Sequence, residues 1–213
     1  MTNHAQEHIN QLTNKTKIKY LDISNRDLTG DADLKEFTSL TSLNSYNNKF
    51  ENLDFLNTLP NKEYLKKLNF FGNQIKELDL AHLLSIFPNL EYLNCENNPL
   101  SAKNLDKLSS EQFDKLVQGI KDKKIKINSW KGTILIDLLE YAQKLIKSGD
   151  SSQQRQAQQL RAILQNGSIE TNQGENNSKH TALIIGGVVA VVIGSVLVGY
   201  LWGKRRKEKE LLD

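Results

Sequence analysis

The sequence predicts an α/β fold: a short solenoid of about four repeats with parallel strands, capped by C-terminal helices and followed by one transmembrane helix. Three observations lead to this prediction. A pattern of apolar residues and asparagine recurs four times within residues 18–108. Three helical stretches with apolar faces follow in residues 109–165, and residues 181–202 carry no charge. At 213 residues, the chain is long enough for one or two domains.

The repeat is clearest in residues 65–75, LKKLNFFGNQI, where the apolar and amide residues follow the spacing L-x-x-L-x-L-x-x-N-x-L. In this copy the pattern is Leu65, Leu68, Phe70, Asn73 and Ile75. The other copies are Ile18, Leu21, Ile23, Arg26 and Leu28; Leu40, Leu43, Ser45, Asn48 and Phe50; and Leu90, Leu93, Cys95, Asn98 and Leu100. Successive copies start 22, 25 and 25 residues apart. Residues 18–108 therefore resemble the leucine-rich repeat family, whose period is about 20–29 residues.

The spacing has a structural reason. Leu68, Asn69 and Phe70 alternate between inward and outward positions, as in a short strand, and the chain then has to turn away from the sheet. The turn leaves backbone groups unpaired inside the coil, and an inward asparagine amide can pair them. We therefore expect a structural ladder of buried asparagines, one in each coil. Its members are Asn48, Asn73 and Asn98.

Two positions depart from the pattern. Arg26 stands where the first asparagine would be, and Ser45 stands where an apolar residue would point inward. We therefore expect a loose or partly capped first coil and a weak point in the core of the second coil.

The resemblance implies a protein-binding module, with the partner on the concave face that the outward strand positions form. The predicted contact residues are Tyr20, Asp22, Asn44, Tyr46, Lys67, Asn69, Phe71, Tyr92, Asn94 and Glu96. Four of them are aromatic, and aromatic residues are enriched at protein interfaces. The alternative is that some of these rings pack against neighbouring strands.

Segments outside the repeats are expected to cover the ends of the stack, because solenoids need caps. Residues 1–17 would form an N-terminal polar cap. Residues 109–165 would form a helical cap that starts at Ser109 and Gln112, which have capping-box spacing. The alternative is that residues 131–165 act as a separate interaction region, with the protein serving as a structural anchor or scaffold. Residues 166–180 are polar, so we expect a flexible stalk.

Residues 181–202 predict a single membrane span. They hold 22 residues without a charge, about 33 Å as a helix, which suits the hydrocarbon core of a bilayer. The basic tail, residues 203–213, begins with Lys204 to Lys207 and suits lipid headgroups. Small residues recur at Gly186, Ala190 and Gly194, so a homodimer through the span is an open alternative.

Two indications about the side of the membrane oppose each other. The basic tail favours a cytosolic C terminus and therefore exported repeats. Residues 1–13, however, lack the apolar core of a signal peptide, and a single cysteine favours a reducing compartment. We expect the repeats to be cytosolic, with the span as a C-terminal anchor.

Other functional classes find little support. The net charge of +3 gives no reason to expect a nucleic-acid partner. No paired carboxylates, activated nucleophile or glycine-rich phosphate loop occurs, so we expect no enzymatic activity and no cofactor. His4, Glu7 and His8 have zinc-enzyme spacing but no third ligand in context, so we expect a short polar helix and no metal site. Cys95 lies at an inward position and should pack as a small apolar residue.

Overall fold

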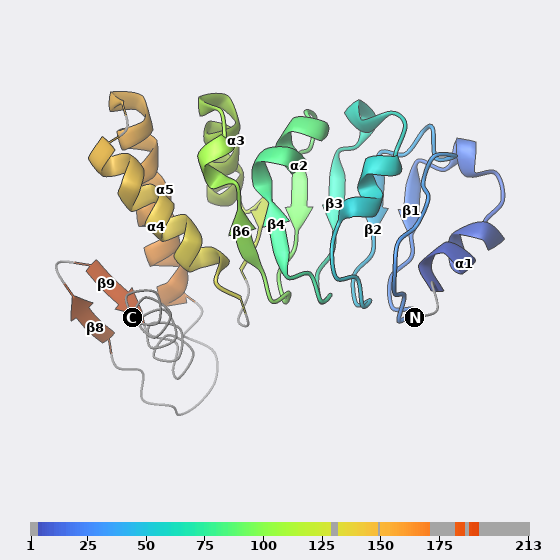
Figure 1. Cartoon of the computed structure of the whole chain (residues 1–213), viewed down its shortest axis with the longest axis horizontal. Coiled ribbons are helices and arrows are strands. Elements are labelled where there is room, and N and C mark those ends of the chain that lie inside the picture. Colours follow the sequence, from blue (N-terminus) through green and yellow to red (C-terminus); the bar gives the residue numbers. More distant parts are fainter. Residues whose placement is uncertain (1–3, 129–131, 149, 171–181, 186–187, 192–213) are drawn as a thin grey trace, which may run out of the picture. The chain divides into compact units, whose positions relative to one another are not determined.

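The computed structural model describes residues 4–128, 132–148, 150–170, 182–185 and 188–191. The chain divides into two compact units, Met1–Ile163 and Leu164–Asp213. The first unit holds all the repeats, whose coils follow one another along its length (Figure 1).

The principal sheet is parallel and has the strand order β1-β2-β3-β5-β7. Its strands are β1 Tyr20–Asp22, β2 Ser42–Asn44, β3 Lys67–Asn69, β5 Tyr92–Asn94 and β7 Ile125–Lys126. Equivalent repeat positions lie opposite each other, as with Leu43 and Leu68. A second parallel sheet pairs β4 Glu77–Asp79 with β6 Ser101–Lys103. The parallel, mixed α/β solenoid expected from the repeat is thereby confirmed.

Two of the helices begin at capping residues that the structure shows clearly. The helices are α1 His4–Gln11, α2 Leu80–Ile86, α3 Ser110–Lys121, α4 Ile134–Ser148 and α5 Ser151–Glu170. Single 3-10 turns lie at Lys15–Lys17, Asp54–Thr58, Lys62–Tyr64 and Leu105–Lys107. Asp79 caps α2 by accepting the N–H of His82 at 2.9 Å. Ser109 and Gln112 form the expected capping box at α3, in which each side chain accepts the other residue's backbone N–H.

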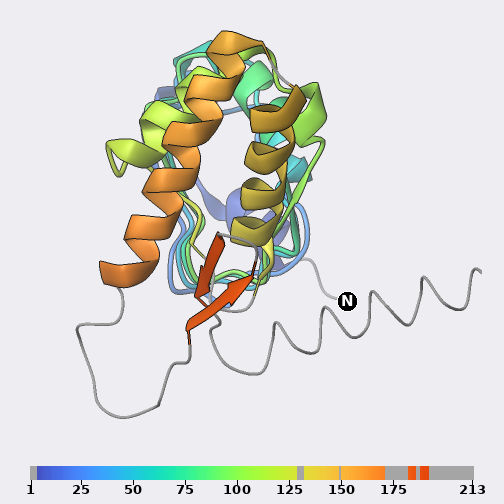
Figure 2. The same ribbon diagram turned by 90° about the vertical axis from the view of Figure 1, so that its left-hand side faces the viewer.

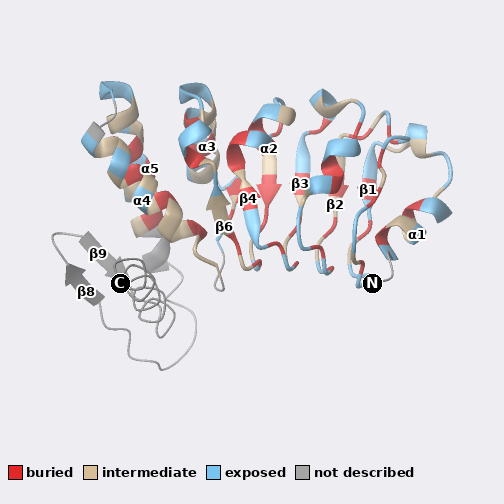
Figure 3. Cartoon of the chain, in the orientation of Figure 1, coloured by how far each residue is buried: buried red, intermediate tan, exposed pale blue. Residues whose placement is uncertain are grey.

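The apolar core runs through the inside of the coils, where the inward strand positions meet the return segments (Figure 3). Phe50, Phe55 and Phe70 are all at most 2% exposed. Their ring centroids are 5.0 to 6.3 Å apart, in stacked and edge-to-face geometries that aromatic rings prefer. These rings bind the second coil to the third.

The ladder asparagines are buried, and each amide links its own coil to the preceding one. In Asn73, Nδ2 donates to the carbonyls of Ser45 at 2.9 Å and Phe70 at 3.1 Å. Its Oδ1 accepts the N–H of Phe50 at 3.1 Å. The amides of the second and fourth coils make equivalent bonds. Backbone groups that the turns leave unpaired are therefore satisfied from the next coil.

This direction of bonding explains the missing asparagine in the first coil. Asn48 Oδ1 accepts the N–H groups of Arg26 at 3.1 Å and Leu28 at 3.0 Å, so the second coil closes the first. Arg26 is exposed and needs no amide of its own, because helix α1 and not another coil packs against this side. The first coil is therefore closed and not loose, and buried Ala5 of α1 covers its end.

The residue before each ladder position has a positive φ. These residues are Asn25, Asn47, Gly72 and Asn97, with φ between 52° and 66°. A left-handed backbone is unfavourable for most residues and is best tolerated by glycine and asparagine. Asparagine or glycine therefore recurs there as a second signature of the repeat, one that the apolar pattern does not reveal.

Strand β7 adds a fifth strand to the four that the repeat predicts. Ile125 lies opposite Leu93, and Lys126 lies opposite Asn94. The strand follows helix α3, so its distance from the fourth strand breaks the constant step of the repeat. Part of the region expected only to cap the stack therefore continues its sheet.

The last coil is covered by the N terminus of α4 (Figure 2). The N–H of Ile134 donates to the carbonyl of Leu100 at 2.9 Å, and Asp137 Oδ2 accepts the N–H of Ala102 at 2.8 Å. Gly132 lies so close to Leu100 that a Cβ would meet its carbonyl oxygen at 2.1 Å. These bonds pair backbone groups at and just before β6, the edge strand of the second sheet, that would otherwise face solvent.

Helix α5 extends to Glu170, into the expected stalk. Its start is well capped, because Asp150 Oδ1 accepts the N–H groups of Ser152 at 2.9 Å and Gln153 at 2.8 Å. Once a helix is nucleated, each further residue adds one hydrogen bond, so a polar continuation is tolerated. Residues 171–180 of the expected stalk lie outside the described residues.

The second unit contains β8 Ala182–Ile185 and β9 Val188–Val191, an antiparallel pair. These residues were expected to be helical. Two runs rich in β-branched residues on either side of Gly186-Gly187 are also typical of a hairpin, which accounts for the difference. The rest of the expected span and the basic tail lie outside the described residues. Within the described ranges, no helix has the length and apolar character to cross a membrane.

Candidate binding surface

The outward positions of the principal sheet form three rows, and we keep the name concave face for them. The first row is Tyr20, Ser42, Lys67, Tyr92 and Lys124. The second row is Asp22, Asn44, Asn69, Asn94 and Lys126. The third row follows the strands and is Ser24, Tyr46, Phe71 and Glu96. All ten predicted contact residues lie in these rows. Lys126 of β7 and Lys124, which directly precedes that strand, join them.

The predicted contact residues differ in how much they expose. Tyr20, Asp22 and Lys67 are exposed. Half-buried positions are Asn44, Tyr46, Asn69, Phe71, Tyr92 and Glu96. Asn94 is only 8% exposed, contrary to the expectation that it faces a partner. Its Nδ2 donates to the hydroxyl of Tyr92 at 3.3 Å and its Oδ1 accepts the N–H of Glu96 at 3.1 Å, while β7 flanks it.

The middle row is tied together by side-chain hydrogen bonds. The amide of Asn69 donates to Asn44 Oδ1 at 2.9 Å, and Asn44 donates in turn to Asp22 Oδ2 at 3.1 Å. Asp22 Oδ1 also accepts the N–H of Ser24 at 3.0 Å. Partial burial raises the pKa of Asp22, but the bonds from Ser24, Asn44 and Tyr20 outweigh it and lower that pKa below its usual value. The row therefore has fixed rotamers and ends on an ionised carboxylate.

The four aromatic rings do not behave alike. Tyr20 is 57% exposed, whereas the rings of Tyr46, Phe71 and Tyr92 are half-buried among their neighbours. The hydroxyl of Tyr46 accepts a hydrogen bond from Asn25 in the preceding coil. Half-buried rings in fixed positions present apolar area that loses little conformational freedom on binding.

Strand β7 brings positive charge to one end of the face. The ammonium group of Lys126 lies 5.9 Å from the centre of the Tyr92 ring, within range of a cation–π contact. The sequence alone did not place Lys124 or Lys126 on this face, because the repeat pattern stops before them. The alternation of isoleucine with lysine in residues 123–127 was their only local signal.

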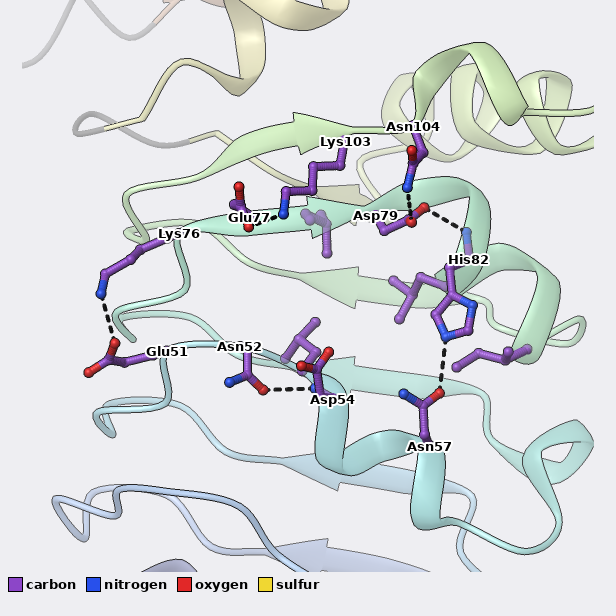
Figure 4. Close-up of a pocket in the computed structure, with 14 residues that line it drawn as sticks. Glu51, Asn52, Asp54, Asn57, Lys76, Glu77, Asp79, His82, Lys103 and Asn104 are labelled. Carbon is purple, nitrogen blue, oxygen red and sulfur yellow. Dashed lines mark hydrogen bonds and ion pairs between the residues drawn. The ribbon is translucent and has the colours of Figure 1, made fainter. Parts of the chain in front are cut away.

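Apart from the concave face, a hollow of about 470 Å³ lies beside β4 and β6 (Figure 4). Four of its charged side chains form two ion pairs, Glu51 with Lys76 and Glu77 with Lys103. Asp79 accepts bonds from the N–H of His82 and the amide of Asn104. Partial burial raises the pKa of Asp79, but these two bonds and the electrostatic attraction of His82 and Lys107 outweigh it and lower that pKa. Most of the polar side chains around the hollow are therefore bonded to one another, and it carries no proposal here.

The candidate metal ligands and the cysteine of the sequence can be placed in the part of the chain that the structure describes. No cluster of three histidine, cysteine, aspartate or glutamate side chains there could hold a metal ion, and this part includes His4, Glu7 and His8. Cys95 is fully buried, and burial raises the pKa of its thiol to about 12. A thiol with this pKa is protonated at neutral pH and is a poor nucleophile.

Comparison with known families gives a match to part of the chain. Residues 65–110 match the family model of leucine-rich repeats in two copies. These residues contain the third and fourth coils, so the resemblance drawn from residues 18–108 is supported over its second half. No curated protein matches the chain. Such repeats suggest a role in protein–protein interaction.

Proposed function

We propose that this chain is a membrane-anchored protein that binds a protein partner on its concave face. The observation that carries the proposal is the hydrogen-bonded middle row, Asp22 to Asn69, with half-buried rings at Tyr46 and Phe71 beside it. A polar row with fixed geometry next to rigid apolar area is the composition that protein interfaces favour.

A photo-crosslinking experiment tests this proposal. A photoreactive residue at Tyr20, the most exposed ring of the face, should form a discrete adduct with one protein in intact cells. Tyr46→Ala and Phe71→Ala should each abolish that adduct. Tyr64→Ala is the matched control, because Tyr64 is 50% exposed but lies on a return segment. An adduct that survives both concave substitutions would contradict the proposed surface.

A second candidate is a scaffold that acts through residues 131–165. It is favoured by half-buried apolar side chains on α4, which are Leu135, Ile136, Leu139, Leu145 and Ile146. Under this proposal, a photoreactive residue at Leu139 would give the adduct, and the concave substitutions would leave it unchanged. The two candidates therefore predict opposite results for Phe71→Ala.

The membrane anchor is proposed from hydropathy and charge. Residues 181–202 lack charge, and the basic residues 204–207 follow directly. The full chain should then stay with membranes under alkaline carbonate extraction. Val188→Arg with Ile193→Arg should release it, because each arginine at mid-span costs about 2.5–3.5 kcal/mol of insertion free energy. Asn176→Arg is the control outside the span and should have no effect.

We further propose that the repeats are cytosolic, which the free thiol of Cys95 favours. Asn14, Asn166 and Asn176 each begin an N-x-S/T sequence that is glycosylated in exported chains. In a eukaryotic cell, deglycosylation should not change the gel mobility of this chain. A mobility shift that disappears with Asn166→Gln and Asn176→Gln would place the repeats on the outer side instead.

A further inference from the structure

Lysines on the flanks of the coils are paired with carboxylates one repeat away. The pairs are Lys49 with Asp27 at 3.0 Å, Lys66 with Glu91 at 3.1 Å, Lys76 with Glu51 at 2.7 Å, and Lys103 with Glu77. These pairs recur from coil to coil, so each of these four lysines has a counter-charge from a neighbouring repeat.

The lysines of the concave face differ from these four. Within the described residues, neither Lys67 nor Lys126 has a carboxylate at ion-pair distance. Lys124 reaches only Asp122, at 4.0 Å. Two positive charges in one small area without counter-charges repel each other, so they are stabilised when a partner supplies negative charge.

The same lysines are clustered around one ring. Lys67 lies opposite Tyr92 in the register of β3 and β5, and the ammonium of Lys126 lies over the Tyr92 ring. Lys124 belongs to the same row on the other side of Tyr92. Neighbouring strands are about 4.8 Å apart, so the Cα atoms of Lys67 and Lys124 are about 10 Å apart. Two carboxylates of one short peptide segment can span this distance.

Carboxylates near this end of the face do not cancel the lysines. Near the three lysines lie half-buried Glu96 and also Asp122, which is 4.0 Å from Lys124, so positive charge remains in excess. Glu91 is already paired with Lys66. Asp22 lies at the opposite end, on β1. The face is therefore acidic at β1 and basic at β3 to β7.

From this arrangement we infer that the β3–β5–β7 part of the concave face binds an acidic segment of the protein partner. Carboxylates of that segment pair with Lys67, Lys124 and Lys126, and the Tyr92 ring contacts its backbone or apolar side chains. This inference rests on the proposed function, because it specifies the chemistry of the partner that the same face takes.

A synthetic peptide of alternating glutamate and serine tests the inference, with alternating glutamine and serine as the neutral control. Fluorescence anisotropy of the labelled peptides is measured against the full chain in a non-ionic detergent. The acidic peptide should bind, and added salt should weaken it. Lys67→Glu and Lys126→Glu should each raise Kd about tenfold, because charge reversal removes an attraction and adds a repulsion.

The matched control is Lys76→Glu, which makes the same change in net charge on the flank and should leave Kd unchanged. Equal weakening by Lys76→Glu would overturn the inference, since attraction would then come from overall charge. Equal binding of the glutamine peptide would also overturn it. Lys67→Gln removes the charge without reversing it and should weaken binding less than Lys67→Glu. A thermal melt of each variant shows whether weaker binding comes from loss of the contact or from loss of the fold.

Two further outcomes are distinguishable. Inorganic polyphosphate and anionic vesicles are tested in the same way. If either binds more tightly than the peptide and depends equally on Lys67 and Lys126, the ligand of this surface is a phosphate compound and the inference of an acidic segment is overturned. Failure of the acidic peptide to bind, with the Tyr20 photo-adduct retained, would overturn this inference alone. Loss of that adduct from the wild-type chain would overturn the proposed function itself.

Discussion

The side-chain amide of Asn98 donates to the carbonyl of Phe70 at 2.8 Å, across 28 residues and one full coil. The same nitrogen donates to the carbonyl of Cys95 at 3.0 Å, and Oδ1 accepts the N–H of Ile75 at 3.0 Å. One buried side chain thus satisfies backbone groups of two successive coils. Each coil depends on the next for its internal hydrogen bonds, which ties neighbouring repeats together.

We predict that Asn73→Leu destabilises the repeats more than Asn69→Leu. Leucine at position 73 leaves the buried N–H of Phe50 without this acceptor, and a buried unpaired group costs about 1–3 kcal/mol. Asn69 is half-buried, and solvent can replace its bonds, so its loss should cost about 1 kcal/mol or less. Urea unfolding of both variants measures the difference. Equal shifts of the midpoint would contradict the ladder.

Gly132→Ala should weaken the cap on the last coil. A Cβ there would meet the backbone oxygen of Leu100 at 2.1 Å and its nitrogen at 2.4 Å, and backbone cannot move aside as a side chain can. We expect a loss of about 1–3 kcal/mol in the free energy of unfolding. Gly119→Ala is the comparison, because its Cβ would meet the side chain of Ile125, and alanine is favoured in a helix by about 1 kcal/mol.

Gly119→Ala should therefore cost less than Gly132→Ala in the same urea titration. Hydrogen exchange at the N–H of Ile134, which bonds to Leu100, should also accelerate only in Gly132→Ala. Unchanged exchange there would show that α4 does not depend on this close approach.

Acid should destabilise the protein partly through Asp79. Its pKa is lowered in the folded state, so it contributes stability above the unfolded pKa of about 3.9. This contribution is lost as pH falls below that value towards the folded pKa. In Asp79→Asn, the free energy of unfolding should fall less steeply with decreasing pH on the acid side. Between about pH 5 and 7, its dependence on pH should be unchanged. An identical acid limb in both proteins would refute the assignment.

Removal of residues 181–213 should leave the repeats folded and soluble. The first compact unit ends at Ile163 and has its own core, so the truncation removes none of the packing described for the coils. The free energy of unfolding should stay within about 0.5 kcal/mol of the value for the full chain in detergent. Aggregation of the truncated protein, seen by size-exclusion chromatography, would show that the second unit protects part of the first.

The sequence by itself determined the coil. Leu68, Phe70 and Asn73 stand at spacings that only a short strand followed by a turn requires, and the same spacing recurs every 25 residues in the third and fourth coils. Such local geometry depends on a few consecutive residues, so it can be predicted from the sequence without knowledge of tertiary contacts. The capping residues Ser109 and Gln112 could be predicted from the sequence for the same reason.

Only the tertiary structure decided which coil each amide serves and what stands beside the fourth strand. Arg26 is tolerated because Asn48 reaches back to the first coil. Lys126 joins the concave face because β7 pairs with β5 after a helix of a length that the repeat does not specify. Burial of Asn94 follows from that same pairing. These features depend on contacts between residues far apart in the chain, and such contacts do not produce a repeating sequence pattern from which they could be predicted.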